Sequence, residues 1–131
     1  MDLIADTSFL VGLWRGQDWA KRYAVEHCGQ SLGLPWVVLG EFWHGAMRAQ
    51  HDEAKVREFL SIGIPIYDAA PVVSVYAQMC ASMQGEPSWL EIAQNDLWIA
   101  ATALACAKPL VTRNHRHFDR IQGLRLEVLE R

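Results

Sequence analysis

The chain has 131 residues, of which 51% are hydrophobic and 21% charged, the composition of an ordinary globular domain. Its formal net charge of −3 argues against a protein that holds nucleic acid by bulk electrostatics alone. No stretch reaches the roughly 18 apolar residues that span a bilayer, and the N-terminus lacks the layout of a signal peptide. We therefore expect one domain over residues 1–131 that is cytoplasmic and has no membrane partner.

The first half of the chain alternates between short apolar runs and amphipathic segments. Leu3-Ile4-Ala5 predicts a buried strand with Asp6 at its carboxyl end. We expect Thr7 or Ser8 to cap a helix that begins near Phe9. The other elements predicted here are helices over 18–28, 36–49 and 52–62, a strand over 31–34 and a short strand at 66–67.

The second half contains the most hydrophobic segment, an alanine-rich helix over 97–107 that Asn95 and Asp96 open. The other predicted elements are a helix over 71–83, a buried strand over 109–112, a loop over 113–117 and an edge strand over 124–128. Strands that alternate with helices predict a parallel sheet between helical layers, and such sheets bind ligands at the carboxyl ends of their strands. Asp6 and the segment 112–117 are both expected at that edge.

Three carboxylates are the main candidate site residues, and each has a structural alternative. Asp6 is of a type common in helix caps, Glu41 lies on a mostly apolar helix where it can face solvent, and Asp96 can compensate a helix dipole. If the three converge, they repel one another unless a cation neutralises them. Such a set suits a hard divalent ion such as Mg²⁺, which lowers the pKa of its water and stabilises charge on a scissile phosphate.

Positive charge is concentrated next to the last of these segments, although the protein as a whole is acidic. Five of the twelve Lys and Arg residues lie between Lys108 and Arg125, together with His115 and His117. A local basic strip of this kind can exist on a protein that is acidic overall. Ordinary solvated surface is the alternative for each of these side chains.

Four segments in the right order resemble the PIN domain, and more narrowly the VapC toxins of bacterial toxin–antitoxin pairs. They are residues 3–8, 39–42, 95–101 and 110–114, the last followed by His117-Phe118. The resemblance implies a three-layer α/β/α domain with a short central, mostly parallel sheet. It also implies an endoribonuclease that depends on Mg²⁺, or alternatively Mn²⁺, and hydrolyses RNA phosphodiester bonds with a metal-activated water.

The resemblance assigns roles to individual residues. Asp6, Glu41 and Asp96 fall on catalytic positions, with Asp6 and Asp96 as the main metal ligands and Glu41 completing the acidic pocket or holding water. Many family members carry a fourth acid where Asn114 and His117 stand. Asn114 can offer a carbonyl oxygen to a metal-bound water, and His117 can contact phosphate or help proton transfer. The residues expected to bind substrate or support the site are Thr7, Thr112, Arg113, Asn114, Arg116 and His117.

The resemblance further implies an RNA substrate, a cognate antitoxin as protein partner, and a homodimer. Two alternatives to the nuclease remain open. A catalytically silent PIN-like module that binds RNA or protein is consistent with the missing fourth acid. A signalling domain like a response regulator needs an acidic pair at the first strand, where Asp6 supplies a single acid.

Overall fold

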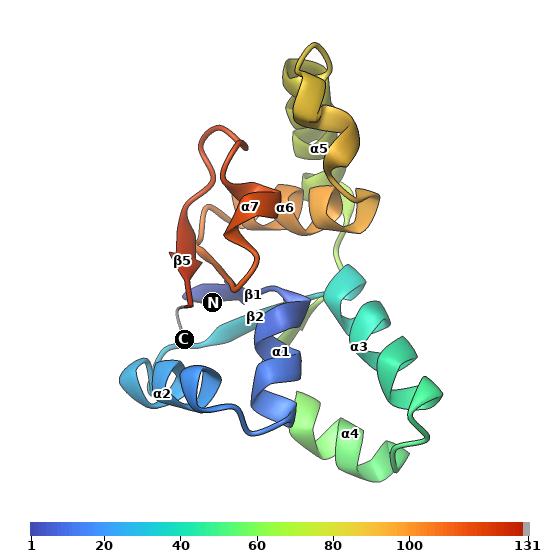
Figure 1. Cartoon of the computed structure of the whole chain (residues 1–131), viewed down its shortest axis with the longest axis vertical. Coiled ribbons are helices and arrows are strands. Elements are labelled where there is room, and N and C mark those ends of the chain that lie inside the picture. Colours follow the sequence, from blue (N-terminus) through green and yellow to red (C-terminus); the bar gives the residue numbers. More distant parts are fainter. Residues whose placement is uncertain (130–131) are drawn as a thin grey trace.

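The structure, a computed structural model, describes residues 1–129, with the backbone alone for Ser88. Within these residues, five strands form one sheet in the order β3-β2-β1-β4-β5, and every neighbouring pair is parallel (Figure 1). The strands are β1 (Leu3–Ala5), β2 (Leu32–Pro35), β3 (Ile64–Ile66), β4 (Leu110–Thr112) and β5 (Leu126–Val128). The predicted parallel sheet is confirmed.

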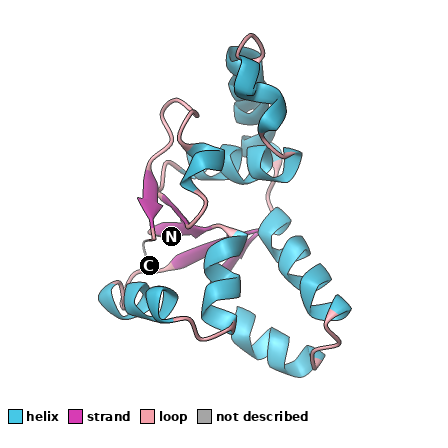
Figure 2. Ribbon diagram, in the orientation of Figure 1, coloured by secondary structure: helices cyan, strands magenta, loops and turns pink. Residues whose placement is uncertain are grey.

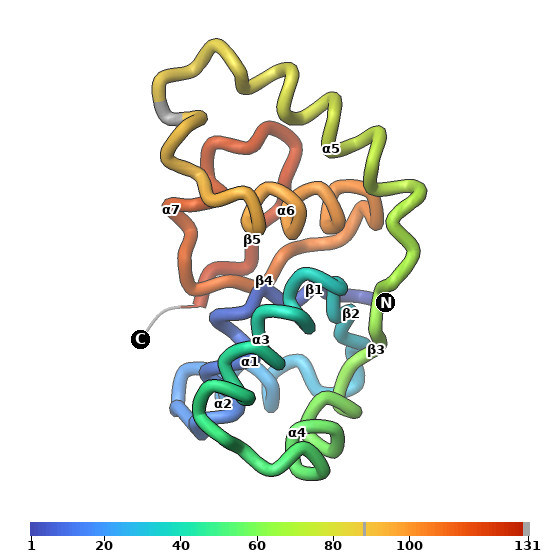
Figure 3. Tube along the Cα trace, turned by 90° about the vertical axis from the view of Figure 1, so that its right-hand side faces the viewer, coloured from blue at the N-terminus to red at the C-terminus, as the bar shows by residue number. Residues whose placement is uncertain are grey.

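Helices cover both faces of this sheet, so the domain has the three layers that the sequence predicts (Figure 2). Helices α1, α2 and α4 lie on one side of the strands, and α5 and α6 lie on the other (Figures 1 and 3). The helices are α1 (Thr7–Trp14), α2 (Asp18–Glu26), α3 (Trp36–Arg48), α4 (Glu53–Leu60), α5 (Ala70–Met83), α6 (Gln94–Cys106) and α7 (His115–Phe118), with a 3₁₀ helix η1 (Pro87–Glu91). None of the helices within residues 1–129 is long and apolar enough to span a bilayer.

Burial on both faces explains why the central strands are continuous apolar runs rather than alternating ones. Ile4, Leu34 and Leu110, one from each of the three central strands, have no exposed surface. Strand β5 lies at an edge of the sheet, as predicted, but it lacks the burial that its alternating pattern predicts, because Glu127 is half-buried like Leu126 and Val128 is exposed.

Two local predictions are wrong. Helix α1 begins at Thr7, and its cap is Asp6, whose Oδ1 accepts a hydrogen bond from the Thr7 N–H at 2.8 Å. The backbone turns immediately after β1, which leaves no room for a later cap. The predicted loop over 113–117 contains the start of α7, a single helical turn that brings Phe118 into the core with no exposed surface.

The strand order determines where a ligand can bind. The chain moves outward from β1 through β2 to β3 and then returns to the other side of β1 as β4. In open α/β sheets, ligands bind in the crevice at such a reversal, outside the carboxyl ends of the strands. Asp6 follows β1 and Thr112 ends β4, and the Asp6 N–H donates to the Val111 carbonyl at 2.9 Å. Helix α3 also contacts α6, which brings Glu41 and Asp96 toward the same edge.

Candidate active site

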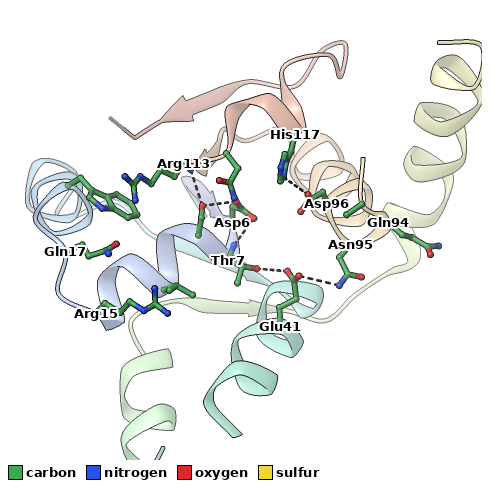
Figure 4. A pocket seen from close by; sticks show the side chains of 15 residues that line it. Asp6, Thr7, Arg15, Gln17, Glu41, Gln94, Asn95, Asp96, Arg113 and His117 are labelled. Carbon is green, nitrogen blue, oxygen red and sulfur yellow. Dashed lines mark hydrogen bonds and ion pairs between the residues drawn. The ribbon is translucent and has the colours of Figure 1, made fainter. Parts of the chain in front are cut away.

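A cavity of about 680 Å³ opens at this edge of the sheet, and Asp6, Glu41 and Asp96 all line it (Figure 4). Asp6 extends from the end of β1, while the other two come from α3 and the first turn of α6. Four of the predicted supporting residues also line the cavity: Thr7, Arg113, Asn114 and His117. Thr112 is buried and hydrogen-bonded to Asp6, whereas Arg116 is exposed on α7 and is not among the lining residues.

Asp6 is held in one orientation by donors on both of its oxygens. Its Oδ2 accepts hydrogen bonds from the Thr112 hydroxyl at 2.7 Å and from the Ser8 hydroxyl at 2.9 Å. The Thr112 oxygen in turn accepts the Asn114 N–H at 2.9 Å. Because Asp6 is only 3% exposed, this network fixes the carboxylate before any ligand arrives.

Asp96 is paired with His117 across the cavity. Nδ1 of His117 lies 2.8 Å from Oδ2 of Asp96, so a protonated imidazole would neutralise this carboxylate. His117 is exposed, and Asp96 is half-buried. His117 thus lies in the neighbourhood where the family resemblance implies a fourth acid.

Glu41 is engaged by hydroxyl and amide groups. The Thr7 hydroxyl donates to its Oε1 at 2.6 Å, and the Asn95 amide donates to its Oε2 at 3.4 Å (Figure 4). Within residues 1–129, no three His, Cys, Asp or Glu side chains gather closely enough to hold a metal ion by themselves. The arrangement is therefore compatible with two direct carboxylate ligands and waters, the usual coordination of Mg²⁺.

The electrostatics of the cavity also suit a cation. Burial raises the pKa of the Asp6 carboxyl and outweighs its hydrogen bonds, which act in the opposite direction. Burial also raises the pKa of Asp96, and the negative charge of Asp6 adds to this effect, while His117 opposes it. Both shifts mean that negative charge in the cavity is poorly compensated. A hard divalent ion bound by Asp6 and Asp96 would relieve that excess.

The sequence of the chain matches a known family over almost its whole length. Residues 3–124 match the model of the PIN domain. The chain belongs to the PIN domain family. Ribonuclease VapC1 of Rickettsia felis is 32% identical to this PIN domain over 135 residues, which cover 98% of this chain and 96% of that protein.

Solved structures resemble this PIN domain over nearly every residue. VapBC2 from Rickettsia felis, bound to a DNA fragment from its promoter, has a TM-score of 0.87 and 26% identity, covering 99% of this chain and 100% of that chain. VapBC-1 from nontypeable Haemophilus influenzae has a TM-score of 0.78 and 25% identity, covering 98% of each chain. The resemblance drawn from the ordered segments is thus confirmed at the level of family and fold.

Several lining residues of this PIN domain were not predicted as site residues. Ser8 supports Asp6 directly, and Arg15, Gln17 and Trp19 form part of the cavity wall. The spacing of Ser8, Val11 and Arg15 along a predicted helix is a signal that places them on the face that carries the site. No sequence pattern indicates Gln17 or Trp19, because they reach the cavity only through the packing of α2 on α1.

The raised pKa of Asp96 predicts that the free energy of unfolding of the metal-free protein depends on pH. Because the folded state binds this proton more tightly than the unfolded state, the free energy of unfolding falls as the pH rises from the ordinary value of 3.8 through the raised pKa. We expect Asp96→Asn to remove this fall. The free energy of unfolding of the variant should therefore rise relative to that of the wild type between about pH 4.5 and 7.

This comparison is made by urea unfolding in EDTA at both pH values. Asp119→Asn is the matched control, because Asp119 is exposed and is not among the lining residues. A wild-type protein that instead gains stability over Asp96→Asn as the pH rises would contradict the prediction.

Proposed function

We propose that this PIN domain is a Mg²⁺-dependent endoribonuclease, with Mn²⁺ as an alternative ion, that hydrolyses RNA phosphodiester bonds. The observation that carries the proposal is the convergence of Asp6 and Asp96, both with raised pKa values, in one cavity at the reversal point of the sheet. The likeness to ribonuclease VapC1 of Rickettsia felis supports the same reaction.

The residues of the cavity have different proposed roles. Asp6 and Asp96 would hold the ion, with Asp6 kept in place by Thr112 and Ser8. When bound, Mg²⁺ supplies charge stabilisation at the scissile phosphate and lowers the pKa of its water. Glu41, steadied by the Thr7 hydroxyl, orients a water molecule through its free lone pairs. His117, which pairs with Asp96 in the absence of ligand, would contact phosphate or transfer a proton once released from that carboxylate.

We also infer that the protein is the toxin of a toxin–antitoxin pair, with a cognate antitoxin as partner and a homodimer as its assembly. The likeness to VapBC2 and VapBC-1, each similar to this chain along nearly its full length, supports the antitoxin partner. The homodimer is an expectation from the family resemblance alone. Co-expression with the product of a neighbouring reading frame, followed by size-exclusion chromatography with light scattering, tests both assemblies.

RNA cleavage with and without metal tests the proposed activity. The purified chain should cut RNA internally in Mg²⁺ or Mn²⁺, lose this activity in EDTA, and regain it when Mg²⁺ is restored. Cleavage that persists in EDTA would contradict the metal dependence. A protein that binds RNA but leaves it intact in both metals would instead favour the catalytically silent binding module.

A further inference from the structure

The cavity continues beyond the carboxylates along one face of α1. Ser8, Val11 and Arg15 line it and are three and four residues apart, which places them on the same face of this helix. At about 1.5 Å per residue, the distance along the helix axis from Thr7 to Arg15 is roughly 12 Å. Successive phosphates of one strand are about 3.4 Å apart along a duplex axis. The cavity is therefore long enough for more than the phosphate that is cut.

The far end of the cavity is cationic. Figure 4 shows Arg15, Gln17 and Arg113 on the side of Asp6 that faces away from Asp96 and His117. None of the ion pairs found within residues 1–129 includes Arg15 or Arg113. Both guanidinium groups are therefore available to bind a phosphate at this end of the cavity.

Arg113 is held through both its backbone and its side chain. Its backbone N–H donates to the Ser8 hydroxyl oxygen at 3.1 Å, and this hydroxyl donates to Asp6 at 2.9 Å. Its guanidinium carbon lies 4.4 Å from the centroid of the Trp19 ring, within the range of a cation–π contact. The backbone contact connects Arg113 to the carboxylate network, and the ring contact restrains where the guanidinium lies.

The position of Trp19 is determined by α1 rather than by Arg113. A Cβ atom on Gly12 would come within 2.6 Å of Cζ2 of Trp19, so the indole lies directly against the helix at a place where only glycine fits. Trp19 is also half-buried and packs against the hydrophobic core. The ring is thus a rigid support on which the long Arg113 side chain rests.

We propose that Trp19 is a positioning residue of the RNA-binding site. By restraining the Arg113 guanidinium at the end of the cavity that Arg15 also lines, it creates a subsite for a phosphate of the RNA other than the one that is cut. This inference rests on the proposed function, because it assumes that RNA occupies the cavity. Trp19 acts on the RNA through Arg113 and not by direct contact.

The test measures binding of a fluorescein-labelled single-stranded RNA by fluorescence anisotropy, at several salt concentrations and in an Asp96→Asn background that prevents cleavage. We expect Trp19→Leu to raise Kd about 3- to 10-fold and Trp19→Phe to stay close to the parent. Arg113→Gln should reduce the slope of log Kd against log salt by about 0.7, and Trp19→Leu should reduce it in the same direction. In the Arg113→Gln background, Trp19→Leu should add no further loss.

The chain offers a matched control in a second cation–π pair. The guanidinium carbon of Arg57 lies 5.3 Å from the centroid of the Trp43 ring, and neither residue lines the cavity. Trp43→Leu removes a comparable ring and should leave Kd and the salt slope unchanged. Arg113→Lys serves if Trp19→Leu does not stay folded by circular dichroism. It keeps the charge and loses the planar stacking, so it should weaken binding like Trp19→Leu.

The outcomes separate this inference from the proposed function. An unchanged Kd in folded Trp19→Leu, an equal loss in Trp43→Leu, or a fully additive loss in the Arg113→Gln background would overturn the positioning role. If the wild-type chain still cuts RNA in Mg²⁺, the proposed function survives that result. A wild-type chain that neither binds nor cuts RNA overturns both.

Discussion

Asp96→Asn is expected to lower the rate of Mg²⁺-dependent RNA cleavage by at least about 100-fold, because removing even an outer contact of a metal site costs about 10- to 100-fold. Asn keeps the size of the side chain and one oxygen but removes the negative charge that the ion requires. Asp96 is half-buried and pairs with His117 alone among the side chains within residues 1–129, so the fold should tolerate the change. Cleavage rates with saturating Mg²⁺ and the midpoint of thermal unfolding measure the two effects.

Asp6→Asn should lower the cleavage rate to a similar extent as Asp96→Asn. Unlike Asp96→Asn, it should also change the free energy of unfolding. Asp6 caps α1 and accepts hydrogen bonds from both Thr112 and Ser8, so the amide must rearrange this network. Asp119→Asn, at an exposed carboxylate that is not among the lining residues, should leave the rate unchanged. Undiminished cleavage by a folded Asp96→Asn or Asp6→Asn protein would reject the assignment of these carboxylates as metal ligands.

Phe118→Ala is expected to reduce the free energy of unfolding by about 3–5 kcal/mol, the usual cost of deleting a buried aromatic ring. Phe118 has no exposed surface, and α7, on which it lies, contacts both α6 and β5. Since small domains are stable by about 5–15 kcal/mol, the loss would be a large part of the total. Urea unfolding with Mg²⁺ absent measures it without a contribution from bound metal.

Arg116→Ala on the same turn provides the control for this change. Arg116 is exposed, so its removal should alter the free energy of unfolding by less than about 0.5 kcal/mol. If Phe118→Ala cost no more than Arg116→Ala, the ring would not be the anchor of α7. His117, the neighbour of Phe118, would then have to be held at Asp96 by other contacts.

The candidate carboxylates were accessible from the sequence, whereas their supports were not. Asp6 follows an apolar run, and Glu41 and Asp96 lie in segments that resemble those of a family, so each could be named in advance. The hydrogen-bond and ion-pair partners of these carboxylates could not be named in advance. Each of these contacts joins side chains from different elements. Thr112 donates to Asp6, Thr7 donates to Glu41, and His117 pairs with Asp96.

The sequence by itself determined the elements that depend on neighbouring residues. The apolar run Leu3-Ile4-Ala5 predicts β1, and the pattern over 36–49 predicts a helix close to α3, because local periodicity decides which face is buried. The misplaced cap of α1 and the missed α7 are the places where a few residues carried too little local information.

Only the tertiary structure decided the strand order and the composition of the cavity. Placing β4 beside β1 joins Asp6 to Thr112, residues separated by most of the chain, and no local pattern encodes such a pairing. Likewise, Trp19 reaches Arg113 because Gly12 lets α2 pack closely on α1. Contacts of this kind depend on how complete elements fill space together, and that is settled by packing across the core rather than by adjacent residues.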